Sequence, residues 1–219
     1  MKTASIILAA GQGTRMRSKL PKVMHTILGK PLIWHAIKAV KELSDLPPVV
    51  VVGHGADLVR QSVADQAQFA LQAEQLGTGH AVMMAESALS GKADLILITF
   101  ADMPLLRAET LEALIRLHQY GTAPLTMTSV VGDVPRGFGR ILRDADGKVK
   151  AIIEEALATP EQLAIREYNV SAYCIDAAWL WASLPKIQVS PKGEYYLTDL
   201  VEIAVKEGHK VESLIVEDP

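Results

Sequence analysis

The sequence predicts an α/β fold, built on a Rossmann-like, mainly parallel mixed sheet with helices on both faces. Apolar runs alternate with segments in which apolar residues recur at helical spacing, which is the pattern of repeated strand–helix units. Several apolar runs are short and continuous, as in PVVVV at 48–52, and such runs are typical of strands covered on both faces. The chain has 219 residues, 49% hydrophobic and 21% charged, so it can bury a core and is too apolar for wholesale disorder.

The elements follow from these patterns in chain order. Strands are expected at residues 5–10, 48–52, 69–72, 94–100, 125–131, 150–155, 168–175 and 211–216. Helices are expected at residues 31–43, 56–66, 78–89, 107–119, 176–183 and 197–207. Ligands of open parallel sheets bind beyond the C-terminal ends of the strands, so functional residues are expected in the loops that follow the strands.

The regular alternation of expected strands and helices ends at about residue 124. Strands dominate from there to residue 175, and DADGK at 144–148 predicts a tight turn between two of them. We therefore expect an antiparallel, strand-rich lobe beside the parallel core. The sequence has no repeat, low-complexity tract or flexible linker, so residues 1–219 are predicted to form a single domain with two parts, about 1–123 and about 124–219.

Composition excludes several classes of protein. The net charge of −3 argues against a general nucleic-acid binder, which carries a basic excess. The single cysteine, Cys174, leaves no disulfide framework and no Cys-x-x-Cys metal site. No apolar run approaches the ~18 residues of a membrane span, and the basic residues follow the first apolar run instead of preceding it as in a signal peptide. We expect a cytoplasmic protein with neither a membrane nor a nucleic-acid partner.

Basic residues are concentrated near the N-terminus. Residues 1–41 hold eight Lys and Arg and no Asp or Glu, whereas residues 42–219 hold 14 basic and 25 acidic residues. A basic segment on an acidic body predicts a localised site for an anion. A solvated surface face is the alternative, and the position of the charges in the chain favours the anion site.

The loop after the first expected strand, LAAGQGTRMRSKLPK at 8–22, is the candidate anion site. Gly11 and Gly13 let the backbone approach a ligand and permit positive φ, and successive N–H groups in such a loop can hold phosphate oxygens. Four cations follow at once, among them Arg15 and Lys22. Neither the six-residue dinucleotide-binding pattern nor the GxxxxGK[ST] pattern fits this loop. A tight turn with solvated basic residues is the alternative.

LAAGQGTRMRSKLPK resembles the signature of sugar-1-phosphate nucleotidylyltransferases, in particular the uridylyltransferase domains of bifunctional bacterial enzymes that make UDP-N-acetylglucosamine. The similarity spans essentially the whole chain. It continues through VVGHGAD (51–57), LQAEQLGTGHA (71–81), ADMPL (101–105), GFGRI (137–141), IIEE (152–155), YNVSAY (168–173) and GEYYLTD (193–199). The resemblance implies the fold of nucleotide-diphospho-sugar transferases, with a nucleotide-binding part at about 1–123 and a sugar-binding part at about 124–219.

The resemblance also implies the reaction. UTP and N-acetylglucosamine 1-phosphate would give UDP-N-acetylglucosamine, a precursor for peptidoglycan and the cell wall, and release pyrophosphate. The sugar phosphate is already an anion, so no general base is needed, and catalysis would be positioning and charge neutralisation. The catalytic residues implied are Arg15, Lys22 and Asp102. The loop residues implied in nucleotide binding are Leu8, Ala9, Ala10, Gly11, Gly13 and Lys22.

The segment after the strand at 69–72 is expected to recognise the base. Gln72 and Gln75 carry amides that offer both a donor and an acceptor, which matches the imide edge of uracil. Gly77 would let the backbone approach the base, and Thr78 can cap the helix that follows. From the residues alone this stretch could equally be a polar helix entry, and the resemblance implies that all four residues bind the nucleotide.

Asp102 follows the apolar strand at 94–100 and is the candidate metal ligand. A carboxylate at the C-terminal tip of a central strand is well placed for Mg²⁺, which prefers oxygen ligands, and an Asp that only starts a turn is the alternative. The resemblance implies that Asp102 holds Mg²⁺ as a cofactor. It also implies a second ligand, an asparagine shortly after the last strand, which has no match up to Pro219, so an incomplete metal site is expected.

The acceptor sugar is expected to bind in the strand-rich part. Glu154 can accept hydrogen bonds from sugar hydroxyls, and Asn169 can both donate and accept. Val170 and Ser171 stand where the family frequently has Thr/Ser-Gly, which bears on sugar preference. The residues that the resemblance places around the sugar are Ala101, Gly139, Glu154 and Asn169.

Two other functions stay open at this point. A different base or sugar phosphate would keep the reaction class, and a missing second metal ligand would favour a nucleotide-binding module without turnover. Nothing in the 219 residues encodes the left-handed β-helix of the bifunctional enzymes, so neither an acetyltransferase nor a trimer is expected of this chain.

Overall fold

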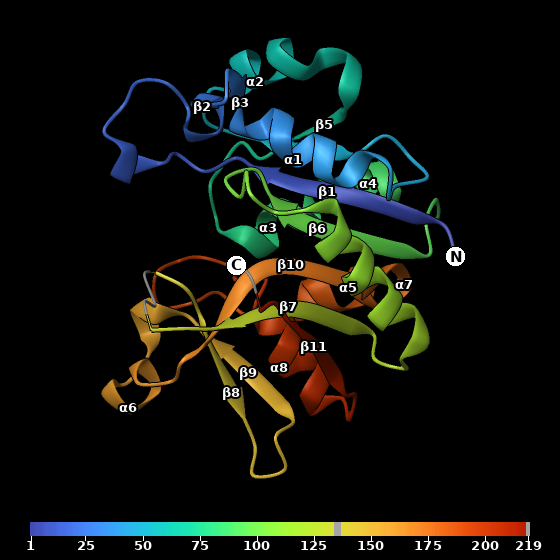
Figure 1. Ribbon diagram of the computed structural model, residues 1–219, viewed down its shortest axis with the longest axis vertical. Helices are drawn as coiled ribbons and strands as arrows, with labels where there is room; N and C mark the ends of the chain where they lie inside the picture. Colours follow the sequence, from blue (N-terminus) through green and yellow to red (C-terminus); the bar gives the residue numbers. More distant parts are fainter. Residues whose placement is uncertain (134–136, 218–219) are drawn as a thin grey trace.

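A mixed β-sheet forms the centre of the molecule (Figure 1). The structure is a computed structural model that describes residues 1–133 and 137–217. Among the described residues the sheet has nine strands, and its main path contains β1 (Thr3–Ala9), β4 (Val49–Val52), β5 (Gln68–Leu71), β6 (Leu95–Phe100), β7 (Leu125–Val131), β10 (Glu167–Asp176) and β11 (Val211–Ile215). Their order across the sheet is β11-β7-β10-β6-β1-β4-β5.

Strand direction in this sheet determines where the functional loops meet. β1 pairs in parallel with β4 and β6, and β4 pairs in parallel with β5. β10 enters antiparallel between β6 and β7, and β11 pairs in parallel with β7. The predicted mainly parallel mixed sheet is therefore confirmed. The C-terminal ends of β1, β4, β5 and β6 share one edge of the sheet with the N-terminal half of β10.

Helices cover both faces of the sheet, as predicted. The helices are α1 (Leu32–Lys41), α2 (Ala56–Val63), α3 (Thr78–Met83), α4 (Glu86–Leu89), α5 (Ala108–Tyr120), α6 (Pro160–Leu163), α7 (Ala177–Ser183) and α8 (Asp199–Lys206). Residues of α1, α2 and α5 pack in one apolar cluster with Ile7 and Ala9 of β1. Residues of α3, α4, α7 and α8 pack in a second cluster with Ile6 and Leu8. This alternation along β1 shows a strand buried on both faces.

The strand-rich lobe is built on a hairpin of β8 (Arg140–Arg143) and β9 (Val149–Ile153), which pair antiparallel. The predicted turn at 144–148 joins them, with Gly147 at φ 80° and the Asp144 carboxylate accepting hydrogen bonds from two backbone amides of the turn. The hairpin connects to the main sheet where Tyr168 of β10 pairs with Arg140. Figure 1 shows the hairpin and α6 at the end of the molecule opposite α2.

Several element boundaries differ from the sequence-based expectation. The helix expected at 78–89 is two helices, because the amide of Ala85 bonds to the carbonyl of Val82, three residues back, and the tightened turn ends α3. The strand expected at 150–155 ends at Ile153, so that Glu154 follows the strand and Glu155 begins a short 3-10 helix (Glu155–Leu157). A short hairpin of β2 (Thr26–Ile27) and β3 (Lys30–Pro31) was not predicted. Among the described residues, no helix is long and apolar enough to cross a membrane.

Candidate active site

The loop after β1 folds back on itself at Gly13. Gly13 adopts a left-handed conformation, with φ 62°, and a Cβ added there would lie 2.6 Å from Cβ of Lys22. Only glycine therefore allows this close approach between the start and the end of the loop. Gly11, by contrast, has no positive φ and has open space around it, which leaves room near its backbone for a ligand. Glycine at position 13 thus serves to place Lys22.

Lys22 and Asp102 meet although they are 80 residues apart in the sequence. Pro21 precedes Lys22, which begins a short 3-10 turn (Lys22–Met24), and Asp102 follows the end of β6. The ammonium of Lys22 donates a hydrogen bond to Oδ2 of Asp102, and the two side chains are 38% and 32% exposed. A pair as accessible as this contributes about 0–1 kcal/mol, so Lys22 can exchange Asp102 for another anion at low cost.

Arg15 extends from the same loop toward the strand-rich lobe. A Cβ added at Gly137 would lie 3.3 Å from Nη1 of Arg15, so the two loops approach each other across the site. Leu8 and Ala9 belong to the buried end of β1, and the predicted nucleotide-binding residues Ala10 and Gly11 follow. The candidate anion-binding loop therefore begins where the strand ends, as the parallel sheet predicts.

The candidate base site lies after β5. Gln72 is buried, and its Nε2 donates to the carbonyl of Gly77 at 3.0 Å and lies 3.1 Å from Nδ1 of His80. Gln75 packs beside it, with Nε2 donating to the Gln72 carbonyl at 3.2 Å. In the part of the chain that the structure describes, Oε1 of Gln72 accepts no hydrogen bond. This oriented acceptor is the group that an imide N–H would need.

Gly77 and Thr78 have structural roles that differ from those expected. Gly77 has φ 100°, and a Cβ there would lie 2.5 Å from the carbonyl oxygen of Tyr195, so its close approach is to protein backbone. The N-cap of α3 is Gly77, without a side-chain cap, and the expectation that Thr78 caps this helix is wrong. Oγ1 of Thr78 instead accepts a hydrogen bond from the amide of Leu197 at 2.9 Å. Both residues thus attach the segment around Tyr195 to the base site.

A cavity of about 120 Å³ lies beside these loops and collects the residues expected to bind sugar. Gly139, Glu154 and Asn169 all line it, together with Thr78 from the base site. The other lining residues are Phe100, Gly137, Phe138, Ser171, Tyr173, Leu197 and Thr198. Three of the four predicted sugar residues therefore come together, although they belong to different strands and loops.

Ala101 is the exception among the predicted sugar residues. Its side chain is fully buried in the apolar cluster with α1 and α5, and its amide donates to the carbonyl of Leu8 at 3.0 Å. The methyl group is therefore not available to a ligand. Ala101 supports the site by fixing the chain between β1 and Asp102.

Glu154 is the acidic group of the cavity. Its Oε1 accepts a hydrogen bond from Oγ1 of Thr198 at 2.8 Å. Burial raises the pKa of Glu154 above its usual range, the hydrogen bond from Thr198 lowers it, and the charge of Glu194 raises it further. Hydrogen bonds from hydroxyl groups stabilise the charged form of a partly buried carboxylate. The hydroxyl groups of a sugar could donate such bonds to Glu154.

Asn169 is held in place by its neighbours. Its Nδ2 donates to the hydroxyl of Tyr173 at 2.6 Å, and its Oδ1 accepts from the amide of Ser171 at 3.0 Å. Its own amide donates to the carbonyl of Gly139 at 2.9 Å. A Cβ at Gly139 would lie 2.7 Å from Cγ2 of Ile152, so glycine is required for β8 to pass β9 at this point. Asn169 and Gly139 therefore form one rigid wall of the cavity.

Ser171 adopts a left-handed conformation, with φ 58°, inside the bulge that interrupts the pairing of β10 with β7. A residue with a Cβ costs about 1–2 kcal/mol in this region, and glycine does not. We expect Ser171→Gly to raise the free energy of unfolding by roughly 0.5–1 kcal/mol, after allowing for the greater chain entropy of glycine.

Urea denaturation measures the free energy of unfolding of the variant and the wild-type protein. Val170→Gly, at the neighbouring residue without positive φ, is the control and should destabilise. A Ser171→Gly protein no more stable than wild type would contradict the interpretation.

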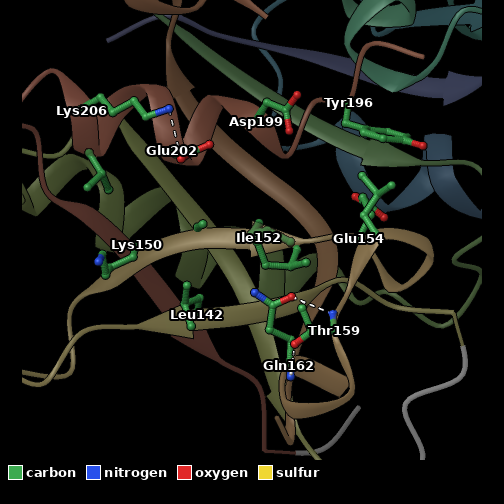
Figure 2. Close-up of a pocket in the computed structure, with 14 residues that line it drawn as sticks. Leu142, Lys150, Ile152, Glu154, Thr159, Gln162, Tyr196, Asp199, Glu202 and Lys206 are labelled. Carbon is green, nitrogen blue, oxygen red and sulfur yellow. Dashed lines mark hydrogen bonds and ion pairs between the residues drawn. The ribbon is translucent and has the colours of Figure 1, made fainter. Parts of the chain in front are cut away.

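A second, larger pocket of about 670 Å³ adjoins the first (Figure 2). It lies between α8 and the β8–β9 hairpin, and Glu154 lines both pockets. Figure 2 shows Tyr196 and Asp199 toward the side of Glu154, and Lys206 paired with Glu202 at 3.1 Å. Burial, followed by the charge of Glu154, raises the pKa of Asp199 to about 6. Glu154 thus lies in the wall that the two pockets share.

The sequence analysis did not identify Thr198 and Tyr196 as site residues, although they belong to the segment GEYYLTD, which resembles the nucleotidylyltransferase family. Thr198 donates to Glu154, and Tyr196 lines the second pocket. The signal available was the placement of several polar and aromatic residues directly before a helix. No spacing rule connects that segment with Glu154, which is 44 residues away.

Asp102 is the candidate carboxylate ligand for Mg²⁺ at this site. Asp102 is accessible and can act as one oxygen ligand once Lys22 moves to another anion. Within residues 1–133 and 137–217 there is no group of three or more His, Cys, Asp or Glu side chains that could hold a metal ion. Asp102 therefore fits Mg²⁺ only if a bound ligand or water supplies the remaining oxygens.

Comparisons with known proteins agree with this architecture. Residues 5–164 match the family model of the MobA-like NTP transferase domain. The bifunctional protein GlmU of Heliobacterium modesticaldum is 44% identical over 218 residues, which are 99% of this chain and 48% of that protein. Its counterpart in Enterococcus faecalis is 45% identical over 208 residues, which are 94% of this chain and 45% of that protein. The chain thus spans about half the length of these curated relatives.

A solved structure shows the same fold. The crystal structure of UDP-glucose pyrophosphorylase complexed with UDP-glucose superposes with a TM-score of 0.78 at 18% identity, covering 99% of this chain and 91% of that one. The similarity confirms the predicted α/β architecture over the full chain. The matches to bifunctional bacterial proteins confirm the resemblance that the sequence motifs indicated.

Proposed function

The chain belongs to the MobA-like NTP transferase domain family, and from this premise we propose that it transfers a uridylyl group from UTP to N-acetylglucosamine 1-phosphate. The observation that carries the proposal is the contact of Lys22 with Asp102 at the edge of the sheet. The acceptor amide of Gln72 and the cavity with Glu154 and Asn169 lie in loops at the same edge. A base, a triphosphate and a sugar can therefore bind side by side.

The reaction we propose is an in-line displacement. An oxygen of the sugar phosphate forms a bond to the α-phosphorus of UTP, and the bond from that phosphorus to the bridging oxygen of the β-phosphate breaks, so that pyrophosphate leaves with the electron pair. No proton transfer is needed, because the attacking oxygen is already charged. Arg15 and Lys22 neutralise phosphate charge, and the loop from Leu8 to Gly11 holds the nucleotide.

Mg²⁺ is the cofactor we propose, with Asp102 as its protein ligand. The ion would supply additional positive charge for the triphosphate, and Mg²⁺ commonly takes its other ligands from phosphate oxygens and water. We further propose the cytoplasm as the place of action, since a lone buried thiol such as Cys174 is usual where disulfides do not form. The product would serve the synthesis of cell-wall polymers.

Release of pyrophosphate from UTP and N-acetylglucosamine 1-phosphate tests the proposal. We expect turnover with this pair and not with either substrate alone. Turnover with another sugar phosphate in place of N-acetylglucosamine 1-phosphate would change the substrate and keep the reaction class. Binding of UTP with no release of pyrophosphate would instead favour a nucleotide-binding module.

The base site predicts a preference for UTP over CTP. Oε1 of Gln72 can accept from the imide N–H of uracil, whereas the ring nitrogen of cytosine has no proton to donate. A buried polar group left unpaired costs about 1–3 kcal/mol, so kcat/KM should be roughly 5- to 150-fold lower for CTP. Parallel assays with the two nucleotides measure the ratio, and Gln72→Leu should reduce it. Equal efficiency of the wild-type protein with CTP would contradict this assignment.

A further inference from the structure

Arg140 is a buried cation next to the sugar cavity. It is 2% exposed, and it begins β8 directly after the loop formed by Gly137, Phe138 and Gly139. Its Nη1 donates to the carbonyl of Phe138, and its guanidinium lies 5.2 Å from the centre of the Tyr168 ring. A buried charge is costly unless it is paired, so the position of Arg140 requires a partner.

The partner is Glu155, and it also binds the loop directly. Oε2 of Glu155 accepts hydrogen bonds from Nη1 and Nη2 of Arg140, both at 3.2 Å. The same oxygen accepts from the backbone amide of Gly137 at 3.0 Å. The Arg140–Glu155 pair therefore holds the loop at two points, the amide of Gly137 and the carbonyl of Phe138.

The loop held in this way forms part of two subsites. Gly137, Phe138 and Gly139 all line the cavity that contains Glu154 and Asn169. Gly137 also approaches Arg15, because a Cβ there would lie 3.3 Å from Nη1 of Arg15. A displacement of this loop would therefore alter the sugar cavity most, because all three residues line it and only Gly137 lies near Arg15.

We propose that Arg140 and Glu155 are positioning residues that hold the loop 137–139 in the conformation that binds the sugar phosphate. This inference rests on the proposed function for the identity of the substrate. Neither side chain lines the 120 Å³ cavity, so neither is assigned a contact with substrate. Both act through the backbone of the loop, and their loss should affect the sugar phosphate more than UTP.

A second arginine–glutamate pair in the same lobe provides a matched control. Nε and Nη2 of Arg143, three residues along β8, donate to Glu167 at 2.7 Å and 2.6 Å. This pair ties β8 to β10 and, among the described residues, makes no hydrogen bond or ion pair with the loop 137–139. Glu167→Ala removes an arginine–carboxylate pair from the same lobe, so it measures the effect of lost stability alone.

The first experiment follows hydrogen exchange of the backbone amides. Glu155→Ala is the main variant, because Glu155 is 42% exposed and its truncation leaves no cavity in the core. We expect faster exchange in peptides that contain residues 137–139 for Glu155→Ala than for Glu167→Ala or wild type. Glu155→Gln retains an acceptor for Gly137 but loses the charge that pairs with Arg140, so it should be intermediate. Unchanged exchange in Glu155→Ala would overturn the proposal, whatever reaction the protein catalyses.

The second experiment separates the two substrates. In Glu155→Ala and Arg140→Met we expect KM for N-acetylglucosamine 1-phosphate to rise about tenfold, while KM for UTP changes less than about twofold. Because the residues act as one unit, the double variant should be no worse than the more impaired single variant. Equal effects on both substrates, or an equal effect of Glu167→Ala, would overturn the positioning role. A wild-type chain without turnover overturns the proposed function instead, so the two failures are distinguishable.

Discussion

Replacement of Lys22 by alanine is expected to lower kcat/KM by about 10²-fold or more while the protein stays folded. Lys22 ends the candidate anion-binding loop and its ammonium contacts Asp102, where the charge of the triphosphate would be neutralised. Removal of one charge contact from a transition state commonly costs this much. Steady-state assays of pyrophosphate release measure the loss, and thermal unfolding measures the stability in the same samples.

The stability of the Lys22 variant should change little. The side chain of Lys22 is 38% exposed in its pair with Asp102. Pairs this accessible contribute about 0–1 kcal/mol to the free energy of unfolding. Lys41→Ala is the matched control, because it removes one exposed positive charge from the same basic segment at the end of α1. The control should retain turnover. An active Lys22→Ala protein, or a Lys41→Ala protein equally impaired, would refute a specific role for Lys22.

Much of the central fold could be predicted because its determinants are local. The continuous apolar run at 48–52 predicted β4, and DADGK at 144–148 predicted the turn between β8 and β9. The loop after β1 was also recognisable, since two glycines and several cations at the end of a buried strand are a local pattern. The sequence did not predict which residue requires glycine at position 13. A Cβ there would collide with Lys22, which is nine positions later in the chain.

The sugar cavity could be predicted only as a set of residues, because its geometry depends on contacts between distant segments. The glycine at position 77 is needed because a Cβ there would lie 2.5 Å from the carbonyl oxygen of Tyr195, a contact with a distant segment. Thr198 contacts Glu154 across 44 residues. Arg140 follows the GFG of a motif quoted for its resemblance, yet its burial and its pairing with Glu155 follow from the packing of two strands and a loop. Periodicity within one segment carries no information on such contacts.

Asp102→Asn is expected to remove most of the activity, by about 10²-fold or more, because the neutral amide retains the shape of the side chain and loses the charge that would hold Mg²⁺. The structure leaves two explanations for such a loss, since Asp102 also accepts a hydrogen bond from Lys22. If Asp102 binds the ion, the concentration of free Mg²⁺ at half-maximal rate should rise in the variant. If Asp102 only orients Lys22, that concentration should stay unchanged while kcat falls.

The dependence of the rate on free Mg²⁺ therefore decides which role Asp102 has. Asp146→Asn, in the exposed turn between β8 and β9, removes one carboxylate far from the site and should leave the Mg²⁺ dependence unaltered. Because the described residues contain no group of three or more His, Cys, Asp or Glu side chains that could hold a metal ion, binding of Mg²⁺ should be weak without nucleotide and stronger with UTP, which calorimetry can measure. An Asp102→Asn protein with wild-type turnover would refute both roles, and the charge of the triphosphate would then be neutralised by Arg15 and Lys22 alone.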